Sequence, residues 1–433
     1  MRILACCLLL VTVSVAAQPA TPPLPPTLPD TPVGHVLADW LDSFNSGDES
    51  RMRAFLEKYR WSSPLIVQMN RRHQTGGYDL TAVRQSEPLR IEFFATERAS
   101  GTRTLARLNV TDSDPPQVVT LLFASLPEGD AAVLGFGIDA QTREKVIDQA
   151  IAQLQELYVV PETAGKMVEA LREHQKAHDY DAVTEGDLFA FFLTVHLRLA
   201  SGDKHVGVRF SPARAPDNPL APDPRQQQRN NCAFRKVEVL PGNVGYVKFD
   251  GFEPPADCGT TAVAAMRLVG NTDALIFDLR DNIGGNPGMV ALICSYLFGE
   301  PTHLNDVWDR TNDTTLQSWT SAYVAGKRLR AVPVYVLTSG RTFSAAEELA
   351  YDLQSLKRAT VVGEATGGGA HGVRPARLDD RFMMIVPFTR SINPVTGTDW
   401  EGHGVQPDVE VPAADALATA QKLASEKLGA AKE

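Results

Sequence analysis

The chain has few cysteines, no run of basic residues and no long apolar segment, and each shortage excludes a class of protein. Five cysteines occur in 433 residues, and the three beyond residue 17 lack the spacing of zinc ligands. The net charge is −10 without any Lys/Arg-rich stretch, which argues against a nucleic-acid partner. An apolar content of 43% and a charged content of 22% are typical of a soluble globular protein.

The first residues have the pattern of a secretory signal. Arg2 provides a positive start, residues 3–13 are apolar but too short to span a bilayer, and residues 15–17 form a small-residue cleavage site. We therefore expect residues 1–17 to be a signal peptide and the mature protein to be periplasmic or secreted. An uncleaved anchor is the alternative.

Export would place the remaining cysteines in an oxidising space. Cys232 and Cys258 flank a strand-like stretch, in segments that we expect to be loops, where they can pair. Cys294 lies in an apolar helical pattern and is expected to be a buried small hydrophobe.

The length of 433 residues predicts two or three domains. Helical periodicity followed by strand-like runs predicts a small α+β accessory domain with a cystatin-like sheet, for which we expect a substrate-docking or packing role. The expected order is a proline-rich linker at 18–33, the accessory domain at 34–135, a helical part at 136–210, an exposed loop at 211–231, an α/β catalytic domain at 232–415 and a C-terminal helix at 416–433.

From Phe234 onward, strand-like and helical patterns alternate, which predicts an α/β core with right-handed crossovers. Ligand sites in such cores lie beyond the carboxyl ends of the strands. Three glycine- and polar-rich segments fall at predicted strand ends, namely 278–285, 339–344 and 363–372. We therefore expect the functional site where these three segments meet.

Ser344 stands at a strand–turn–helix junction. An apolar run at 332–337 predicts a buried parallel strand, and a helical pattern begins at Ser344 itself. A hydroxyl there lies at a positive helix end, in the geometry of the nucleophile elbow of other hydrolases. The alternative is a structural N-cap, with Glu347 closing a capping box.

The motifs at these strand ends resemble those of the C-terminal-processing (tail-specific) serine peptidases. The resemblance covers about residues 140–415, in which three motifs occur in the family's order. They are D-L-R-D-N-I-G-G at 278–285, T-S-G-R-T-F-S-A-A-E at 338–347 with V-V-G-E-A-T-G-G-G at 361–369, and G-H-G-V-Q-P-D at 402–408. The resemblance implies a crotonase-like or ClpP-like mixed-sheet α/β core with Ser344 as its nucleophile.

The chain departs from the family's best-known pattern at Gly369, where many members carry the lysine that activates the serine. The segment G-D-K-H that ends at His205 is similar to the tricorn-core and interphotoreceptor retinoid-binding-protein-like branch. This resemblance implies His205 as the base and Glu401 as the acid that orients it. Asp203 and Glu347 are rivals for the role of the acid.

The resemblance also implies an acyl-enzyme mechanism, in which backbone N–H groups stabilise the oxyanion. Ala345 and either Gly285 or Gly284 are the expected donors. We expect a polypeptide substrate, no cofactor, no metal and no nucleic-acid partner, while an oligomer stays open. Two alternatives share this scaffold or this chemistry, namely a carrier of apolar ligands such as retinoids or fatty acids and an esterase acting on small esters.

Overall fold

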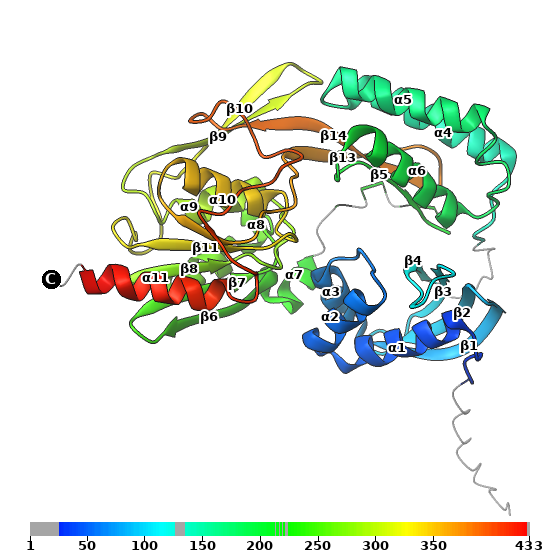
Figure 1. Cartoon of the computed structure of the whole chain (residues 1–433), viewed down its shortest axis with the longest axis horizontal. Helices are drawn as coiled ribbons and strands as arrows, with labels where there is room; N and C mark the ends of the chain where they lie inside the picture. The colour runs from blue at the N-terminus through cyan, green and yellow to red at the C-terminus, as the bar shows by residue number, and fades with distance from the viewer. Residues whose placement is uncertain are drawn as a thin grey trace, which may run out of the picture.

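The computed structural model describes residues 26–125, 135–212, 214–215, 217–218, 220 and 224–430, which form three sheets with their own helices (Figure 1). The expected signal peptide and the first part of the expected linker lie outside the described residues. No helix in the described ranges is long and apolar enough to cross a membrane.

The N-terminal unit consists of three helices on a four-stranded antiparallel meander. Its core contains Trp40, Phe44 and Phe93, all at most 1% exposed. The expected linker end at residue 33 is wrong, because Pro32 begins the first helix and Val33 is fully buried. The elements are α1 (Pro32–Ser46), α2 (Glu49–Lys58), α3 (Leu65–Thr75), β1 (Tyr78–Glu87), β2 (Arg90–Glu97), β3 (Arg103–Val110) and β4 (Val118–Ser125), of which α3 and β1 were not predicted.

Three helices follow and cover a second sheet. The helices are α4 (Ala140–Leu157), α5 (Pro161–Lys176) and α6 (Gly186–Ser201), as the apolar periodicity predicted. They share a core with Phe382, Met384 and Val386 of the sheet's central strand. The strands run β10 (Thr314–Trp319), β9 (His303–Asp309), β14 (Phe382–Ile392) and β13 (His371–Arg377), and β5 (Gly207–Phe210) also pairs with β14.

The third sheet is the α/β core that the alternating pattern predicted. Its strands are ordered β15 (Val409–Glu410), β12 (Thr360–Gly363), β11 (Val334–Thr338), β8 (Ala274–Asp278), β7 (Val244–Phe249) and β6 (Phe234–Leu240). All neighbours are parallel except β6 and β7. One face packs on α8 (Pro255–Leu268), α9 (Pro287–Cys294) and α10 (Ala345–Ser355), and the other on α11 (Ala416–Ala430) (Figure 1).

Two expectations for the segment before this sheet need correction. The expected exposed loop at 211–231 contains the helix α7 (Pro224–Arg229), and its residues Gln227 and Asn230 are only 3% and 4% exposed. Cys232 and Cys258 form a disulfide, but Cys232 lies in a short 3-10 helix (Asn231–Ala233) and Cys258 in α8, so neither lies in a loop. Cys294 is a free, buried thiol at the end of α9.

A buried charge cluster joins the N-terminal unit to α6. The Arg107 guanidinium on β3 is 5% exposed and contacts the carboxylates of Glu92, Glu185 and Asp187. The Asn109 amide donates to the same Asp187 carboxylate, at 2.7 Å. Because Asp187 is fully buried and belongs to the first turn of α6, this cluster fixes the unit against the helical part.

Arg107→Met is expected to lower the free energy of unfolding by about 3 kcal/mol, because three carboxylates would lose their shared buried cation. Urea denaturation monitored by circular dichroism measures the change. The control is Arg103→Met, since Arg103 begins the same strand but is exposed. Equal stability of the two variants would contradict the role assigned to Arg107.

Candidate active site

Ser344 lies at the N-cap of α10, directly after the turn that follows β11. Its backbone has φ 55° and ψ −124°, a region that non-glycine residues rarely occupy and that is characteristic of functional turns. Its backbone N–H donates to the Glu347 carboxylate at 2.8 Å, as in the reciprocal half of a capping box. Ser344 is partly exposed.

The Glu347 carboxylate joins this helix end to the glycine-rich loop. It accepts hydrogen bonds from the backbone N–H groups of Gly368 (2.6 Å) and Gly369 (2.9 Å) and from the Thr366 hydroxyl. Burial raises the pKa of Glu347, although these hydrogen bonds partly oppose the shift. Both of its oxygens are therefore engaged in positioning backbone, which argues against Glu347 as the acid that orients the histidine.

The structure brings His205 beside the nucleophile turn. Its ring lies 4.5 Å, between centroids, from the ring of Phe343, the residue before Ser344. Its Nδ1 atom is buried and has no hydrogen-bond partner among the described residues. Burial lowers the pKa of His205 to about 4, so its ring is neutral at pH 7, as a general base requires. No hydrogen bond between this ring and the Ser344 hydroxyl occurs in the part of the chain that the structure describes.

A buried acidic network lies behind His205. One oxygen of Asp203 accepts the His205 backbone N–H at 2.8 Å and lies 3.9 Å from His205 Nδ1. The other oxygen contacts His371 Nδ1 (2.8 Å) and the Tyr158 hydroxyl (3.0 Å). Burial acts to raise the pKa of Asp203, but the hydrogen bond and charge interaction with His371, together with the interactions with His205, outweigh it and hold this pKa below the usual range. Asp203 is thus an ionised carboxylate at neutral pH.

Glu401 borders the same network. Its Oε2 accepts the Ala370 backbone N–H at 2.6 Å and lies 3.6 Å from His371 Nδ1. Burial raises the pKa of Glu401 to about 7. The predicted hydrogen bond with the base is not formed, although one ligand atom each of Asp203, His205 and Glu401 lie within 4.8 Å of one another. Such a group is able to hold a metal ion, but two carboxylates beside a histidine are also what a catalytic histidine needs for its orientation.

The candidate oxyanion donors come from two adjoining turns. The Phe343 N–H donates to the Asn282 carbonyl at 3.0 Å, which holds the turn before Ser344 against residues 282–285. The Gly284 N–H is occupied by the Asn282 side chain at 2.9 Å. The N–H groups of Gly285 and Ala345 have no partner within the described ranges. Of the two glycines expected from the sequence, Gly285 therefore has the available donor.

Steric crowding explains why the residue at position 369 is glycine. A Cβ atom there would lie 2.3 Å from Phe343 Cζ and 2.6 Å from His205 Cε1. A lysine side chain and the His205 ring therefore cannot share this space. The Lys204 ammonium group donates to the Gly367 carbonyl at 2.6 Å instead.

Sequence reasoning missed the contribution of His371 and Tyr158. Neither residue is among the catalytic residues predicted from the sequence, although His371 lies within the predicted segment 363–372. The position of His371 at the start of β13, directly after the glycine-rich loop, was the available signal. The contact with Asp203 spans 168 residues, and no local pattern could reveal it.

Two adjoining parts of the chain match known peptidase-family domains. Residues 243–411 match peptidase family S41, and residues 140–241 match the N-terminal domain of that family in eukaryotic IRBP. The chain is 25% identical over 234 residues to carboxyl-terminal-processing peptidase 2, chloroplastic, of Arabidopsis thaliana, covering 50% of this chain. It spans only 42% of the length of that relative.

Two solved structures also resemble the chain. The photosystem II D1 C-terminal processing protease has a TM-score of 0.40 and 14% identity, over 63% of this chain and 94% of that one. The tricorn protease has a TM-score of 0.44 and 13% identity, over 82% of this chain and 42% of that one.

Gly369→Ala is expected to destabilise the fold by about 1–3 kcal/mol, because the new methyl group would overlap Phe343 and His205. The melting temperature in thermal denaturation and the rate of Ser344 labelling by a fluorophosphonate should both fall. Gly340→Ala is the matched control, since a Cβ atom at Gly340 meets nothing within 4 Å. An unchanged melting temperature and labelling rate for Gly369→Ala would contradict the crowding.

Proposed function

Residues 140–241 and 243–411 belong to peptidase family S41, and we propose that the chain is an exported serine endopeptidase of the tail-specific type. The observation that carries the proposal is Ser344 itself. It is a strained and partly exposed serine in a turn bordered by the free N–H groups of Gly285 and Ala345.

In the proposed mechanism, Ser344 Oγ attacks the carbonyl carbon of the scissile peptide bond while His205 takes the hydroxyl proton. The N–H groups of Gly285 and Ala345 stabilise the negative oxygen of the tetrahedral intermediate, and each such donor contributes about 3 kcal/mol. His205 then gives its proton to the leaving amine. Water attacks the acyl-enzyme with the same histidine as base, which releases the acid product and restores Ser344.

We assign Glu401 as the acid that steadies the His205 cation. Both oxygens of Asp203 already accept hydrogen bonds, whereas Glu401 Oε1 has none within the described residues. Asp203 remains the rival, because one of its oxygens lies 3.9 Å from His205 Nδ1. A rotation of the His205 ring or of the Glu401 carboxyl group on substrate binding would complete the contact.

Export is supported by two features. The N-terminal pattern is that of a signal peptide, and the disulfide between Cys232 and Cys258 suits an oxidising space. The proposed substrate is a polypeptide that can reach the edge of the sheet where Ser344 lies.

A fluorescent fluorophosphonate should label the wild-type protein, and Ser344→Ala should abolish the labelling. His205→Ala should slow it by about 10³-fold, because the hydroxyl loses its base. Glu401→Gln should slow it more than Asp203→Asn if Glu401 is the orienting acid. His178→Ala serves as a control, because this histidine is 78% exposed and pairs only with Asp181.

Absence of labelling together with saturable binding of apolar dyes would contradict the peptidase and favour the apolar-ligand carrier. Labelling without cleavage of polypeptides, but with turnover of small esters, would favour the esterase.

The dependence of kcat/KM on pH should have its acidic limb near pH 4, below the ordinary histidine value of 6.5. The sign follows from burial, which disfavours the imidazolium and leaves the ring neutral, and able to accept a proton, down to that pH. Peptide cleavage followed between about pH 3 and 8, with circular dichroism to verify folding, measures the limb. The Glu401 carboxyl group, whose pKa is raised to about 7, can itself cause a limb near the ordinary histidine value, so only a limb there that persists in Glu401→Gln would exclude a buried base.

A further inference from the structure

We propose that Arg53, in the N-terminal unit, is a positioning residue for the peptidase reaction and acts through Asp281. The inference rests on the proposed function, and it assigns the N-terminal unit a part in the catalytic site. Asp281 lies in the D-L-R-D-N-I-G-G segment, directly before Asn282.

Asp281 is a buried carboxylate that gathers three cations from separate elements. Arg53 on α2 binds both of its oxygens in a bidentate fork, at 3.0 and 3.1 Å. Lys248 on β7 lies 3.0 Å away, and Arg341 in the turn before Ser344 lies 2.9 Å away. The Asp281 side chain is 8% exposed, whereas the side chains of Lys248, Arg53 and Arg341 are 19%, 30% and 49% exposed.

The residues beside Asp281 hold both turns of the candidate site together. The Asn282 side chain binds the Gly284 N–H, and the Asn282 carbonyl accepts the Phe343 N–H. The Ser339 hydroxyl donates to the Arg280 carbonyl at 2.6 Å, and the Thr342 hydroxyl donates to the Leu279 carbonyl at 2.8 Å. A shift of Asp281 would therefore displace Gly285, which supplies a proposed oxyanion donor, and Ser344, the proposed nucleophile.

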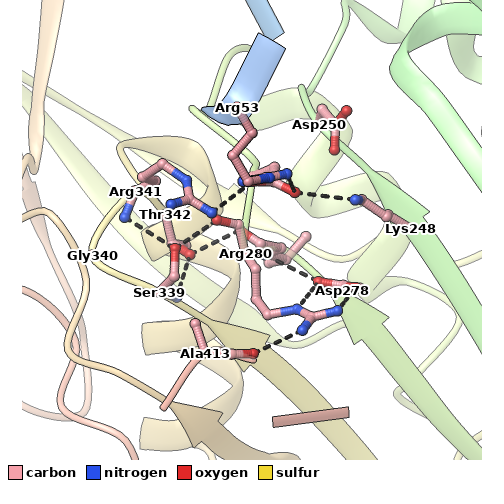
Figure 2. Close-up of polar contacts among 12 residues, drawn as sticks. Arg53, Lys248, Asp250, Asp278, Arg280, Ser339, Gly340, Arg341, Thr342 and Ala413 are labelled. Atoms are coloured by element: carbon pink, nitrogen blue, oxygen red, sulfur yellow. Dashed lines mark hydrogen bonds and ion pairs between the residues drawn. The ribbon is translucent and has the colours of Figure 1, made fainter. Parts of the chain in front are cut away.

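The carboxylates next to Asp281 have cationic partners of their own. Asp278 pairs with Arg280 (Figure 2). Asp250 pairs with Arg235, so Asp281 is the carboxylate that Arg53, Lys248 and Arg341 share. Its pKa lies well below the usual range, because the cations overcome the effect of burial. Arg53 is the member of the set that comes from outside the peptidase domain, and its fork orients the carboxylate as a single point charge cannot.

Removal of Arg53 should leave the N-terminal unit in place. The unit is also anchored by the buried Arg107 cluster and by Asn70 on α3, whose side chain contacts Asn230 and Arg235. A change at Arg53 therefore tests the coupling to the active site and not the docking of the whole unit.

The experiment compares Arg53→Met with Arg51→Met in the full chain. Arg51 lies on the same helix, but its guanidinium pairs with Asp42 inside the N-terminal unit. We expect kcat for a peptide substrate to fall about 10- to 100-fold in Arg53→Met with little change in KM, since small displacements of catalytic groups have effects of this size. Arg51→Met should behave as wild type, and Arg53→Lys should restore part of kcat.

Hydrogen exchange of segments 279–285 and 339–344 provides a readout that does not depend on activity. Exchange there should be faster in Arg53→Met than in Arg51→Met. If the wild-type protein proves inactive, the proposed function fails, while the exchange data still decide whether Arg53 holds these turns. The proposal would be overturned if Arg53→Met had the kcat and the hydrogen exchange of the wild type. It would also be overturned if Arg53→Met had a lower melting temperature but an unchanged kcat at temperatures well below that melting temperature.

Discussion

The geometry of the candidate site depends on the hydrogen bonds that the buried Glu347 carboxylate accepts. This carboxylate lies one helical turn after Ser344, accepts the Ser344 N–H, and binds the N–H groups of Gly368 and Gly369. A single group thus holds the nucleophile turn and the glycine-rich loop in register. Because these donors would otherwise be buried without partners, the carboxylate stabilises both segments at once.

Position 369 shows how tightly this arrangement is packed. The absence of a side chain at Gly369 leaves room for the rings of His205 and Phe343. A side chain at this position would overlap the His205 and Phe343 rings where they now lie. A histidine base in place of a lysine also changes the chemistry, because a buried neutral imidazole accepts a proton at neutral pH without the desolvation that an amine needs.

The site is assembled from parts of the chain that are remote in sequence. His205 precedes β5, Ser344 follows β11, and Glu401 lies after β14, so two different sheets contribute to it. The N-terminal unit reaches the same region through Arg53, while the Arg107 cluster fixes the unit to α6. The unit thus has ionic contacts with both the helical part and the α/β core, whereas a domain joined only by a linker would need neither contact.

Local patterns in the sequence determined the α/β core, the three helices before it and the place of Ser344 at a strand–helix junction, because apolar periodicity and turn residues act over a few positions. They did not reveal β5, β9, β10 or β13, since these strands are short or polar and are defined by pairing with distant partners. The expectation of His205 and Glu401 came from the resemblance to the tricorn-core branch.

Only the tertiary structure decided which atoms meet. It showed that the Gly284 N–H has a hydrogen-bond partner while the Gly285 N–H has none among the described residues. It also showed that the Glu347 carboxylate binds backbone N–H groups and that Asp203 pairs with His371. These contacts depend on the packing of two sheets and on burial, which set distances and pKa values that no single segment of the chain encodes.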